Sequence, residues 1–393
     1  MEGWDIENLD NFAFINPTEK LAKGTMATKV AMTDLQPFTK KIQSFSIEPY
    51  NGGMKFRNGD TLVARITPCI ENGKSAYVDV LKEDEIGFGS TEYIVLRQKS
   101  NSSNKQYLYY FSQSDIFRRI AIKSMTGTSG RQRVQTDVVR NTEFYFPPLP
   151  EQKAIAGVLS ALDDKIDLLH RQNKTLEALA ETLFRQWFIE EAEDNWEEGE
   201  LGDILTMKGG STPSTKNEDY WGGDIHWTTP RDLSNSASLY LLDTARKITK
   251  AGLNKITSGL LPKGTLLMSS RAPVGYLALS EVPISINQGY IAILDNKGFS
   301  KYFIYLWLKL HMPYVKSFAN GSTFQEISKA SFKTLEIVIP PKLSVEKFTT
   351  KIEPNFTKIK ANTYQIQTLE NLRDTLLPKL MSGAVRVRFE DAA

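Results

Sequence analysis

The sequence predicts an α+β protein with two similar globular domains separated by two long helices, which pair as an antiparallel coiled coil. Three observations support this fold class: an internal repeat, heptads in two segments, and short β-rich runs bounded by turn residues. The repeat is plainest where TLEALAETL (175–183) returns 193 residues later as TLENLRDTL (368–376), with three differences. A period of this length indicates duplicated domains, in a pseudo-twofold tandem arrangement, rather than a solenoid.

The repeat extends over nearly the whole chain and sets the expected domain boundaries. QRVQTDVVRNTEFYFPP (132–148) aligns without a gap on QEISKASFKTLEIVIPP (325–341), and weaker similarities lie upstream. We therefore expect a first globular domain at 1–148, a helical spacer at 149–193, a second globular domain at 194–341, a second helical spacer at 342–385, and a C-terminal tail at 386–393.

The sequence of each globular copy predicts short strands and one amphipathic helix. DTLVARI and EYIVLR in the first copy, and GTLLMSS and GYIAIL in the second, are apolar, β-rich and bounded by turn residues. QYLYYFSQSDIFRRIAI and KYFIYLWLKLHMPYV each predict one amphipathic helix. Each copy ends in a strand followed by two prolines, which stop strand pairing.

Both spacers carry apolar residues at alternating spacings of four and three, as in a coiled-coil seam. The first seam contains Ile155, Leu159, Leu162, Ile166, Leu169, Asn173, Leu176, Ala180 and Leu183. The second contains Phe348, Ile352, Asn355, Ile359, Asn362, Ile366, Leu369, Arg373 and Leu376. We expect Pro354 to break the second helix, and the seam asparagines to fix register. The alternative, that the stripes are ordinary domain core, fits their length poorly.

Composition excludes several classes of protein. The single cysteine cannot form an internal disulfide, and three scattered histidines give no metal-ligand spacing, so we expect no metal and no cofactor. The net charge of +2 does not by itself indicate a nucleic-acid binder. No apolar run is long enough to cross a membrane, and the acidic N-terminus lacks a secretory h-region, which predicts a cytoplasmic protein.

Several longer motifs carry a family resemblance. FPPLPEQKAIAGVL leads into a helix ending LFRQWF, TLLPKLMSG closes the second helix, and GGSTPSTKNEDYWGGDIHWTTPRDL lies at 209–233. With these motifs the chain resembles, over its full length, the specificity (S) subunits of Type I restriction-modification systems. One departure is PPKLSVEKF, which lacks the Glu-Gln pair of the first copy.

The resemblance implies a DNA-binding subunit that is not itself an enzyme. Each globular domain would be a target-recognition domain that reads one half of a bipartite sequence in double-stranded DNA. The helices would set the spacer between the halves and dock two methyltransferase (M) subunits, whereas the presence of restriction (R) subunits stays open. For docking we expect exposed apolar flanks on the first helix at Leu168, Leu179 and Phe184.

In the first domain, RRIAIKSMTGTSGRQR (118–133) has five cations and no acid, and ends in side chains that suit bidentate contacts to purines. The alternative is a solvated basic face beside a loop. The predicted DNA-binding residues of this domain are Lys55, Arg65, Lys74, Arg118, Arg119, Lys123, Arg131, Gln132 and Arg133.

In the second domain the matching stretch, NGSTFQEI (320–327), has a glutamine but no arginine, so the two domains should read different bases. KGGSTPSTK lacks the spacing of a P-loop, but its backbone N–H groups and hydroxyls suit phosphate contacts. The predicted residues are Lys208, Ser211, Thr212, Trp227, Arg231, Arg271 and Gln325, with Trp227 alternatively a core aromatic.

Two other functional classes remain as alternatives. One is a coiled-coil protein scaffold that does not bind DNA, and the other is a stand-alone enzyme that modifies nucleic acid. The sequence has no Gly-rich cofactor loop and no Asn or Asp before its Pro-Pro pairs, as an adenine methyltransferase would need, and it offers no catalytic residue set.

Overall fold

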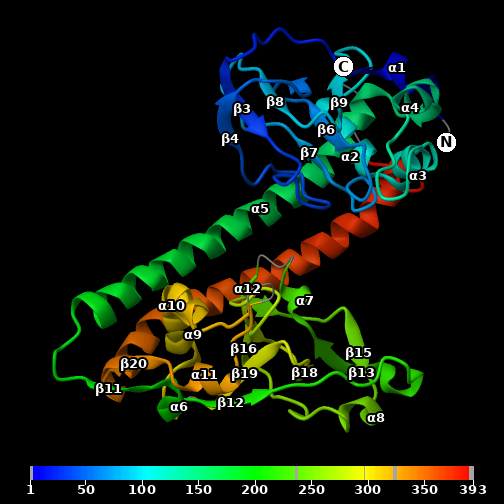
Figure 1. Cartoon of the computed structure of the whole chain (residues 1–393). Helices are drawn as coiled ribbons and strands as arrows, with labels where there is room; N and C mark the ends of the chain where they lie inside the picture. Colours follow the sequence, from blue (N-terminus) through cyan, green and yellow to red (C-terminus); the bar gives the residue numbers. More distant parts are fainter. Residues whose placement is uncertain (1–2, 235–237, 296, 322–324, 389–393) are drawn as a thin grey trace. The chain divides into compact units, whose positions relative to one another are not determined.

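The computed structural model describes residues 3–234, 238–295, 297–321 and 325–388. The chain forms two compact units (Figure 1): unit 1 comprises 1–167 and 367–393, and unit 2 comprises 168–366. Each unit therefore holds one globular domain and a part of each of the two longest helices, α5 (Leu149–Arg185) and α12 (Lys342–Met381). Within the described residues, no helix is both long and apolar enough to span a membrane.

Unit 1 contains three small sheets. Their strand orders are β1-β10, β2-β9-β6-β7 and β4-β3-β8-β5. The strands are β1 (Asp5–Asn8), β2 (Ala13–Ile15), β3 (Met26–Val30), β4 (Ser46–Pro49), β5 (Lys55–Phe56), β6 (Thr61–Ala64), β7 (Ser75–Tyr77), β8 (Gly87–Gly89), β9 (Tyr93–Gln98) and β10 (Glu143–Phe146). The helices of its globular domain are α1 (Leu9–Phe12), α2 (Lys105–Gln113), α3 (Asp115–Lys123) and α4 (Thr136–Asn141).

Unit 2 follows the same plan with a larger central sheet. Its strand orders are β11-β20, β12-β19-β16-β17-β14 and β15-β13-β18. The strands are β11 (Glu197–Glu200), β12 (Thr206–Gly209), β13 (Trp221–Thr228), β14 (Tyr240–Leu241), β15 (Arg246–Ile248), β16 (Leu266–Ser269), β17 (Leu277–Ser280), β18 (Ile284–Ile286), β19 (Tyr290–Asp295) and β20 (Glu336–Ile339). The shorter helices are α6 (Leu201–Ile204), η2 (Glu218–Tyr220), α7 (Pro230–Ser234), α8 (Lys250–Leu253), α9 (Lys301–Leu310), α10 (Met312–Ser317) and α11 (Lys329–Lys333).

Strand registers make the two globular domains comparable residue by residue. Thr61 pairs with Leu96 where β6 meets β9, and Leu266 pairs with Ile293 where β16 meets β19. The helix that follows is capped alike in both copies, by the side chain of Asn104 before α2 and of Ser300 before α9. The predicted α+β class and tandem duplication are thereby confirmed.

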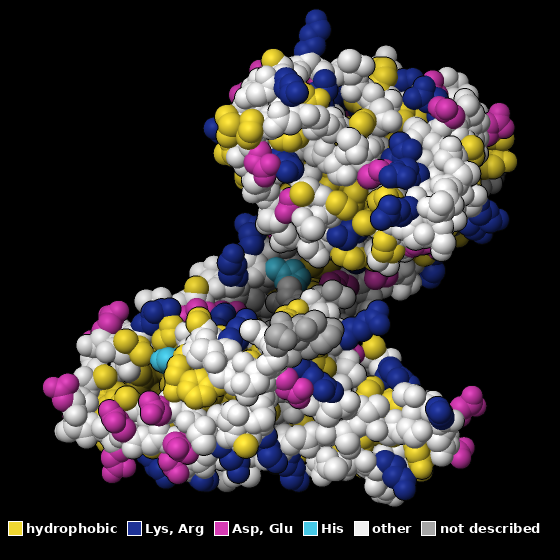
Figure 2. All heavy atoms as spheres, in the orientation of Figure 1, with side chains coloured by type: hydrophobic (Ala, Val, Ile, Leu, Met, Phe, Trp, Pro, Cys, Tyr) yellow, Lys and Arg dark blue, Asp and Glu magenta, His cyan; other side chains and the backbone are white. Residues whose placement is uncertain are grey.

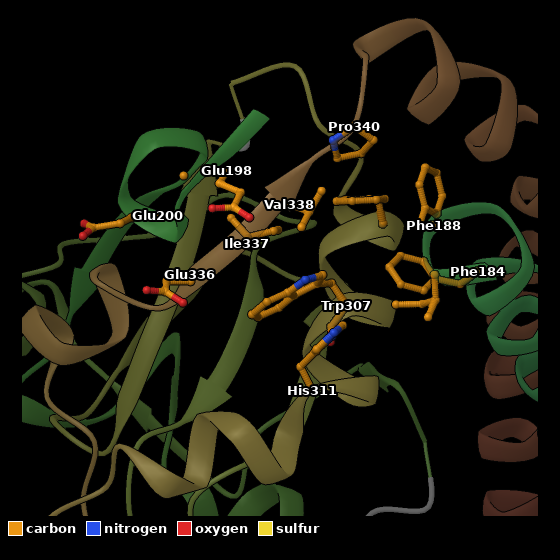
Figure 3. A pocket seen from close by; sticks show the side chains of 13 residues that line it. Phe184, Phe188, Glu198, Glu200, Trp307, His311, Glu336, Ile337, Val338 and Pro340 are labelled. Atoms are coloured by element: carbon orange, nitrogen blue, oxygen red, sulfur yellow. The ribbon is translucent and has the colours of Figure 1, made fainter. Parts of the chain in front are cut away.

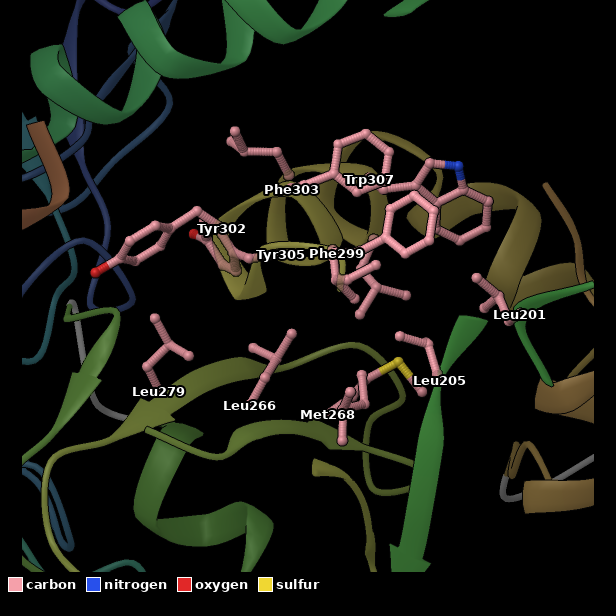
Figure 4. Close-up of a cluster of buried hydrophobic side chains, with 14 of the residues drawn as sticks. Leu201, Leu205, Leu266, Met268, Leu279, Phe299, Tyr302, Phe303, Tyr305 and Trp307 are labelled. Carbon is pink, nitrogen blue, oxygen red and sulfur yellow. The ribbon is translucent and has the colours of Figure 1, made fainter. Parts of the chain in front are cut away.

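The core of unit 2 forms where α9 covers the central sheet. Leu266 and Met268 of β16 lie on one side of α9, and Phe303 and Trp307 lie on the other (Figure 4). Phe303 packs against Phe184 of α5, and Tyr302 stacks on Phe356 of α12. The seven successive residues 302–308 are all aromatic or large and apolar, and all are buried, because α9 is enclosed by the sheet and by both long helices of its unit. In unit 1, α2 is likewise buried, within a cluster that includes parts of α5 and α12.

The long helices pair within each unit, in antiparallel direction. In unit 2 the Asn362 amide donates to Asn173 Oδ1 at 2.8 Å, and in unit 1 the Arg373 guanidinium donates to Asp163 at 2.9 Å. Beyond Arg185, α5 continues as one π-helical turn (Gln186–Glu190).

The expectation that Pro354 breaks the second helix is wrong. α12 runs without interruption from Lys342 to Met381. Pro354 is exposed, whereas its neighbours Ile352 and Phe356 are fully buried. Packing on both sides of the proline outweighs the one backbone hydrogen bond that it removes.

Candidate nucleic-acid interface

A turn and a loop meet in the same way in both globular domains. In unit 1, the turn that follows β6 lies beside the end of the 126–134 loop, where the Val134 N–H donates to the Arg65 carbonyl at 2.8 Å. The Thr67 N–H donates to the Gln132 carbonyl at 3.0 Å. Three of the predicted residues, Arg65, Gln132 and Arg133, are thus brought together.

An acidic residue that the sequence did not single out completes this cluster. The Arg133 Nε lies 2.8 and 3.0 Å from the two carboxylate oxygens of Glu92, and Arg65 lies 3.8 Å from the same carboxylate. The hydrogen bond to Glu92 raises the pKa of Arg133. Arg133 is therefore oriented and partly neutralised within the fold. Sequence alone gives no signal for this pair, because 41 residues separate its members.

The other predicted cations of unit 1 fall into two groups. Lys55 donates to the Glu19 carbonyl, Lys74 to the Met32 carbonyl at 3.0 Å, and Arg118 to the Glu71 carbonyl at 2.8 Å, so these three tie segments of the domain together. The second group is exposed, and its side chains form no ion pair or hydrogen bond with any described residue: Arg119, Lys123 and Arg131.

Unit 2 repeats the backbone arrangement with different side chains. The Ile327 N–H donates to the Ser270 carbonyl at 3.0 Å, which is the counterpart of the Val134 contact. Here the arginine is on the turn and the acid on the loop: Arg271 lies 3.5 Å from Glu326. Gln325 is exposed beside Glu326. The predicted pair Arg271 and Gln325 thus occupies the same edge of the domain as the cluster of unit 1.

The Gly-rich loop of unit 2 uses its polar groups internally. The Ser211 N–H donates to the Ile286 carbonyl at 3.1 Å, and its hydroxyl donates to the Lys255 carbonyl at 3.2 Å. The Thr212 hydroxyl donates to Gln288 at 2.6 Å, and Lys208 donates to the Ser258 carbonyl at 3.3 Å. The contacts require a close backbone approach, because a Cβ at residue 210 would lie 2.0 Å from the Ile286 oxygen. This geometry does not fit the predicted phosphate contacts.

Trp227 is buried, with 3% of its surface exposed, and packs with Ile248 and Ile256. The alternative interpretation as a core aromatic is therefore the one that the structure bears out, and a direct DNA contact does not fit. Arg231, in contrast, is exposed and makes no side-chain hydrogen bond or ion pair within the described part of the chain.

A stacked arginine near Trp227 was missed from sequence. The guanidinium carbon of Arg246 lies 3.5 Å from the centre of the Trp221 ring, and the arginine is exposed. Stacking on an aromatic face fixes a guanidinium while leaving its N–H groups available for phosphate or base edges. Pairing of β15 with β13 creates this contact, and no local pattern marks it.

The predicted partner-binding residues lie on α5 with different exposure. Leu168 and Leu179 are exposed at 39% and 49%, as expected of apolar flanks. Phe184 is only 1% exposed, so the expectation that it is an exposed flank is wrong. It packs against Phe188, Phe303 and Phe348 in the core of unit 2.

Phe184 instead lines a pocket of about 480 Å³ in unit 2 (Figure 3). Its walls combine apolar side chains, from the end of α5 and from Trp307, with polar groups, and burial lowers the pKa of His311 in the lining. Three glutamates stand around it, Glu198, Glu200 and Glu336. These carboxylates would repel phosphates, so the pocket does not belong to a DNA-binding surface.

The face of the molecule drawn in Figure 2 carries charges of both signs. Lys and Arg side chains are interspersed with Asp and Glu on the face in Figure 2. Among the described residues, no three His, Cys, Asp or Glu side chains gather closely enough to hold a metal ion. Contacts with DNA would therefore depend on individual exposed cations at the turn and loop edges rather than on a continuous basic surface.

The model of the family described as the Type I restriction modification DNA specificity domain matches the chain twice, at residues 1–178 and 193–371. The chain belongs to this family. The two matched ranges place one specificity domain in each half of the repeat, and each range includes a globular domain and most of the long helix that follows it.

Curated relatives in this family are similar to the chain over different lengths. The HindI specificity subunit of Haemophilus influenzae is 23% identical over 97% of this chain and 96% of its own. The MjaIX specificity subunit of Methanocaldococcus jannaschii is 37% identical, but over 49% of this chain and 45% of its own. The first of these spans both specificity domains, whereas the match to MjaIX spans about half of each chain.

A solved structure supports the fold of the specificity family. The S subunit of a Type I restriction-modification system from M. genitalium matches with a TM-score of 0.55 and 19% identity, over 99% of this chain and 97% of its own. This likeness concerns the fold.

Proposed function

We propose that the chain is the DNA-recognition subunit of a Type I restriction-modification complex, in which each globular domain reads one half of a bipartite target. The observation that carries this proposal is the duplicated turn-and-loop edge, which has one backbone arrangement and two different sets of polar side chains. Membership in the specificity family supports DNA as the ligand. The target-recognition domains would be 1–148 and 194–341, the helical spacers 149–193 and 342–385, with a tail at 386–393.

Base recognition in the first domain would rest mainly on Arg131 and Gln132, with Arg133 held in place by Glu92. Arginine and glutamine present donors that match purine edges in the major groove. Arg119 and Lys123 would contact phosphates, which position a protein on the duplex but carry no sequence information. In the second domain, Gln325 and Arg271 occupy the corresponding edge, and Arg231 and Arg246 are exposed cations elsewhere in the same domain.

The helices would dock two M subunits, and R subunits would join through that assembly. Leu168 and Leu179 are exposed apolar residues on α5, and additional helices commonly cover such residues in a helical bundle. The chain itself would supply no catalysis and need no cofactor. The purified chain should transfer no methyl group from S-adenosylmethionine to mixed-sequence duplex DNA, and activity should appear when the M subunit is added.

Changing the length of both helices tests whether they set the spacer between half-sites. Insertion of seven residues after Asn173 and seven after Ile366 keeps the apolar seam in phase and lengthens each helix by roughly 10 Å. The methylated half-sites should keep their bases while their separation grows by about three base pairs. A variant that still methylates the original spacing would show that the helices do not determine it.

The direct test of the proposed function is genome-wide mapping of methylated adenines after co-expression of the chain with its M subunit. A split motif with two constant halves is expected. Exchange of residues 194–341 for the corresponding domain of another family member should replace one half and leave the other unchanged. A motif that changes in both halves, or no methylation at all, would overturn the assignment of one half to each domain.

A scaffold that binds proteins alone is the second candidate. Binding of duplex DNA that weakens steeply with added salt would exclude a pure scaffold, because such a protein releases no counterions from phosphates.

A further inference from the structure

On the mostly apolar seam between α5 and α12, two layers join polar side chains of both helices, one layer in each unit. In unit 2 the layer is the Asn173–Asn362 pair, and Asn362 is completely buried. In unit 1 the layer is the Asp163–Arg373 pair, and Asp163 also accepts a hydrogen bond from the Tyr110 hydroxyl at 2.6 Å. Both layers join a residue of α5 to a residue of α12.

The internal repeat shows that neither layer is duplicated. At the 193-residue offset, Asn173 corresponds to Ile366 and Asn362 to Leu169. By the same offset, Asp163 corresponds to Phe356 and Arg373 to Ala180. All four counterparts are buried apolar residues. Both polar layers therefore correspond to apolar pairs in the repeat, and both of these apolar pairs lie in unit 2.

This asymmetry matters because α5 and α12 derive from the same repeat and have similar seams. Two copies of the chain could in principle pair like with like, α5 with α5 and α12 with α12. In the same antiparallel register, each polar residue would then face the counterpart of its present partner. Asn173 would face Leu169 of the second copy, and Asp163 would face Ala180. On α12, Asn362 would face Ile366, and Arg373 would face Phe356.

We infer that Asp163, Asn173, Asn362 and Arg373 make α5 and α12 selective for each other and exclude pairing of like helices between two copies of the chain. Asp163 and Asn362 are buried, and a buried amide or charge without a partner is strongly unfavourable. Asn173 and Arg373 are half-buried and would lose their partners as well, so all four residues oppose the like-with-like arrangement. A single buried asparagine is known to decide partner choice in coiled coils, at some cost in stability. The inference is independent of DNA binding.

A cysteine reporter distinguishes the two arrangements in the full-length chain. In like-with-like pairing, residue 171 of one α5 lies opposite residue 171 of the other, whereas in α5–α12 pairing it faces the region of Tyr364. A chain with Arg171→Cys and Cys69→Ser therefore carries one thiol, and a short bis-maleimide should link two such chains only when like helices pair. This chain is expected to stay monomeric in sedimentation velocity and to give almost no cross-linked dimer.

Removal of the asparagine layer should allow like helices of two chains to pair. In the reporter chain, Asn173→Ile with Asn362→Leu makes both helices apolar at these positions, and the cross-linked dimer should rise at least tenfold. Addition of Asp163→Leu and Arg373→Leu should raise it further. The matched control is Lys165→Ala with Lys358→Ala, an equivalent pair of exposed positions, which should leave the chain monomeric.

The outcomes separate clearly. A folded Asn173→Ile, Asn362→Leu chain that gives no more cross-linked dimer than its parent would overturn the inference, as would efficient cross-linking of the parent itself. If the double variant does not fold, Asn173→Ile alone is the second test: it removes the partner of Asn362 and makes α5 apolar at this position of the seam. Dimer formation through residue 171 is again expected, and its absence counts against the inference.

Discussion

The turn-and-loop edges of the two globular domains share a backbone but place their charges differently. In unit 1 the loop residue Arg133 pairs with Glu92, and in unit 2 the loop residue Glu326 pairs with Arg271 of the turn. The strand registers make Glu92 equivalent to Gly289, and Ile66 to Arg271. The backbone hydrogen bonds are kept, so the frame does not depend on which side chains it carries. Such a frame can change the bases that it reads without refolding.

The helical parts of the two units differ in the same way. Buried Asp163 and half-buried Arg373 of unit 1 correspond to Phe356 and Ala180 of unit 2, so an ion pair and an apolar contact fill equivalent places. Duplication thus fixed the scaffold, while the chemistry at equivalent positions diverged. Substitutions at equivalent positions can therefore show which functions depend on the backbone that both units share and which depend on the side chains of one unit.

The largest effect is expected at the docking residues. Leu179 of α5 and its counterpart Leu372 of α12 are exposed at 49% and 45%. If the M subunits dock at equivalent positions of α5 and α12, Leu179→Glu should remove one M subunit and Leu372→Glu should remove the other. The double variant should bind none. Native mass spectrometry of the co-expressed complex gives the copy number.

The combination of Leu168→Glu with Leu179→Glu should likewise prevent docking on α5 while both globular domains stay folded. Exposed Lys165→Glu is the control for added negative charge. Two M subunits retained on the Leu179→Glu, Leu372→Glu chain would place docking elsewhere.

The next effect concerns stability at the equivalent seam positions. Phe356 is fully buried and stacks on Tyr302 with ring centres 4.2 Å apart, so Phe356→Ala should cost about 3–5 kcal/mol. Asp163→Asn keeps the shape but weakens two hydrogen bonds, and should cost about 1–3 kcal/mol. Urea unfolding measures the loss of stability of each variant. Hydrogen exchange of peptides from each unit shows which unit the substitution destabilises. No loss of stability in the Asp163→Asn chain would mean that Asp163 acts only by filling space.

The sequence was sufficient to predict the repeat, the fold class and the helical seams, because hydrophobic periodicity and a long repeat are properties of the chain itself. The sequence did not predict contacts between residues that are far apart in the chain. Glu92 with Arg133, and Trp221 with Arg246, come together only through strand pairing. It failed also where packing overrides a local preference, as at Pro354 and at the buried Phe184.

A smaller effect is expected from the arginines of the two edges. Arg131→Ala should relax recognition of one half-site by about 1–3 kcal/mol and leave the other half unchanged, if Arg131 contacts a base. Arg133→Ala should act on the same half, because Arg133 shares that edge. Arg271→Ala should relax the other half. The frequency of methylation at near-cognate sites measures each change.

A phosphate contact predicts a different pattern. Affinity would then fall evenly across sequences, and the slope of the logarithm of affinity against that of salt would decrease by about one. Methylation of the same sites at the same rate by Arg131→Ala and Arg133→Ala chains would show that this basic edge is merely solvated.

The smallest effect is a difference in acid sensitivity between the two central sheets. In unit 1, Glu19 accepts hydrogen bonds from Arg57 at 2.7 Å and from Arg97 at 2.6 Å, and Arg97 also binds Asp60. The hydrogen bond from Arg57 holds the pKa of Glu19 below its ordinary value, with Arg97 contributing. In unit 2 the positions of Asp60 and Arg97 are taken by Thr265 and Leu294, which cannot form this network.

A carboxyl group whose pKa is lowered by folding stabilises the native state above its unfolded pKa, and this contribution is lost as the pH falls through the folded value. Acidification below about pH 4.5 should therefore speed hydrogen exchange in β6 and β9 more than in β16 and β19. Glu19→Gln should remove most of that difference by weakening β6 and β9 already at neutral pH. Glu48→Gln is the matched control, because its pKa is also lowered, by Lys29, but Glu48 is exposed to solvent, which screens its ion pair. Equal acid sensitivity of the two sheets in the wild-type chain would mean that the network around Glu19 orients these strands without stabilising them.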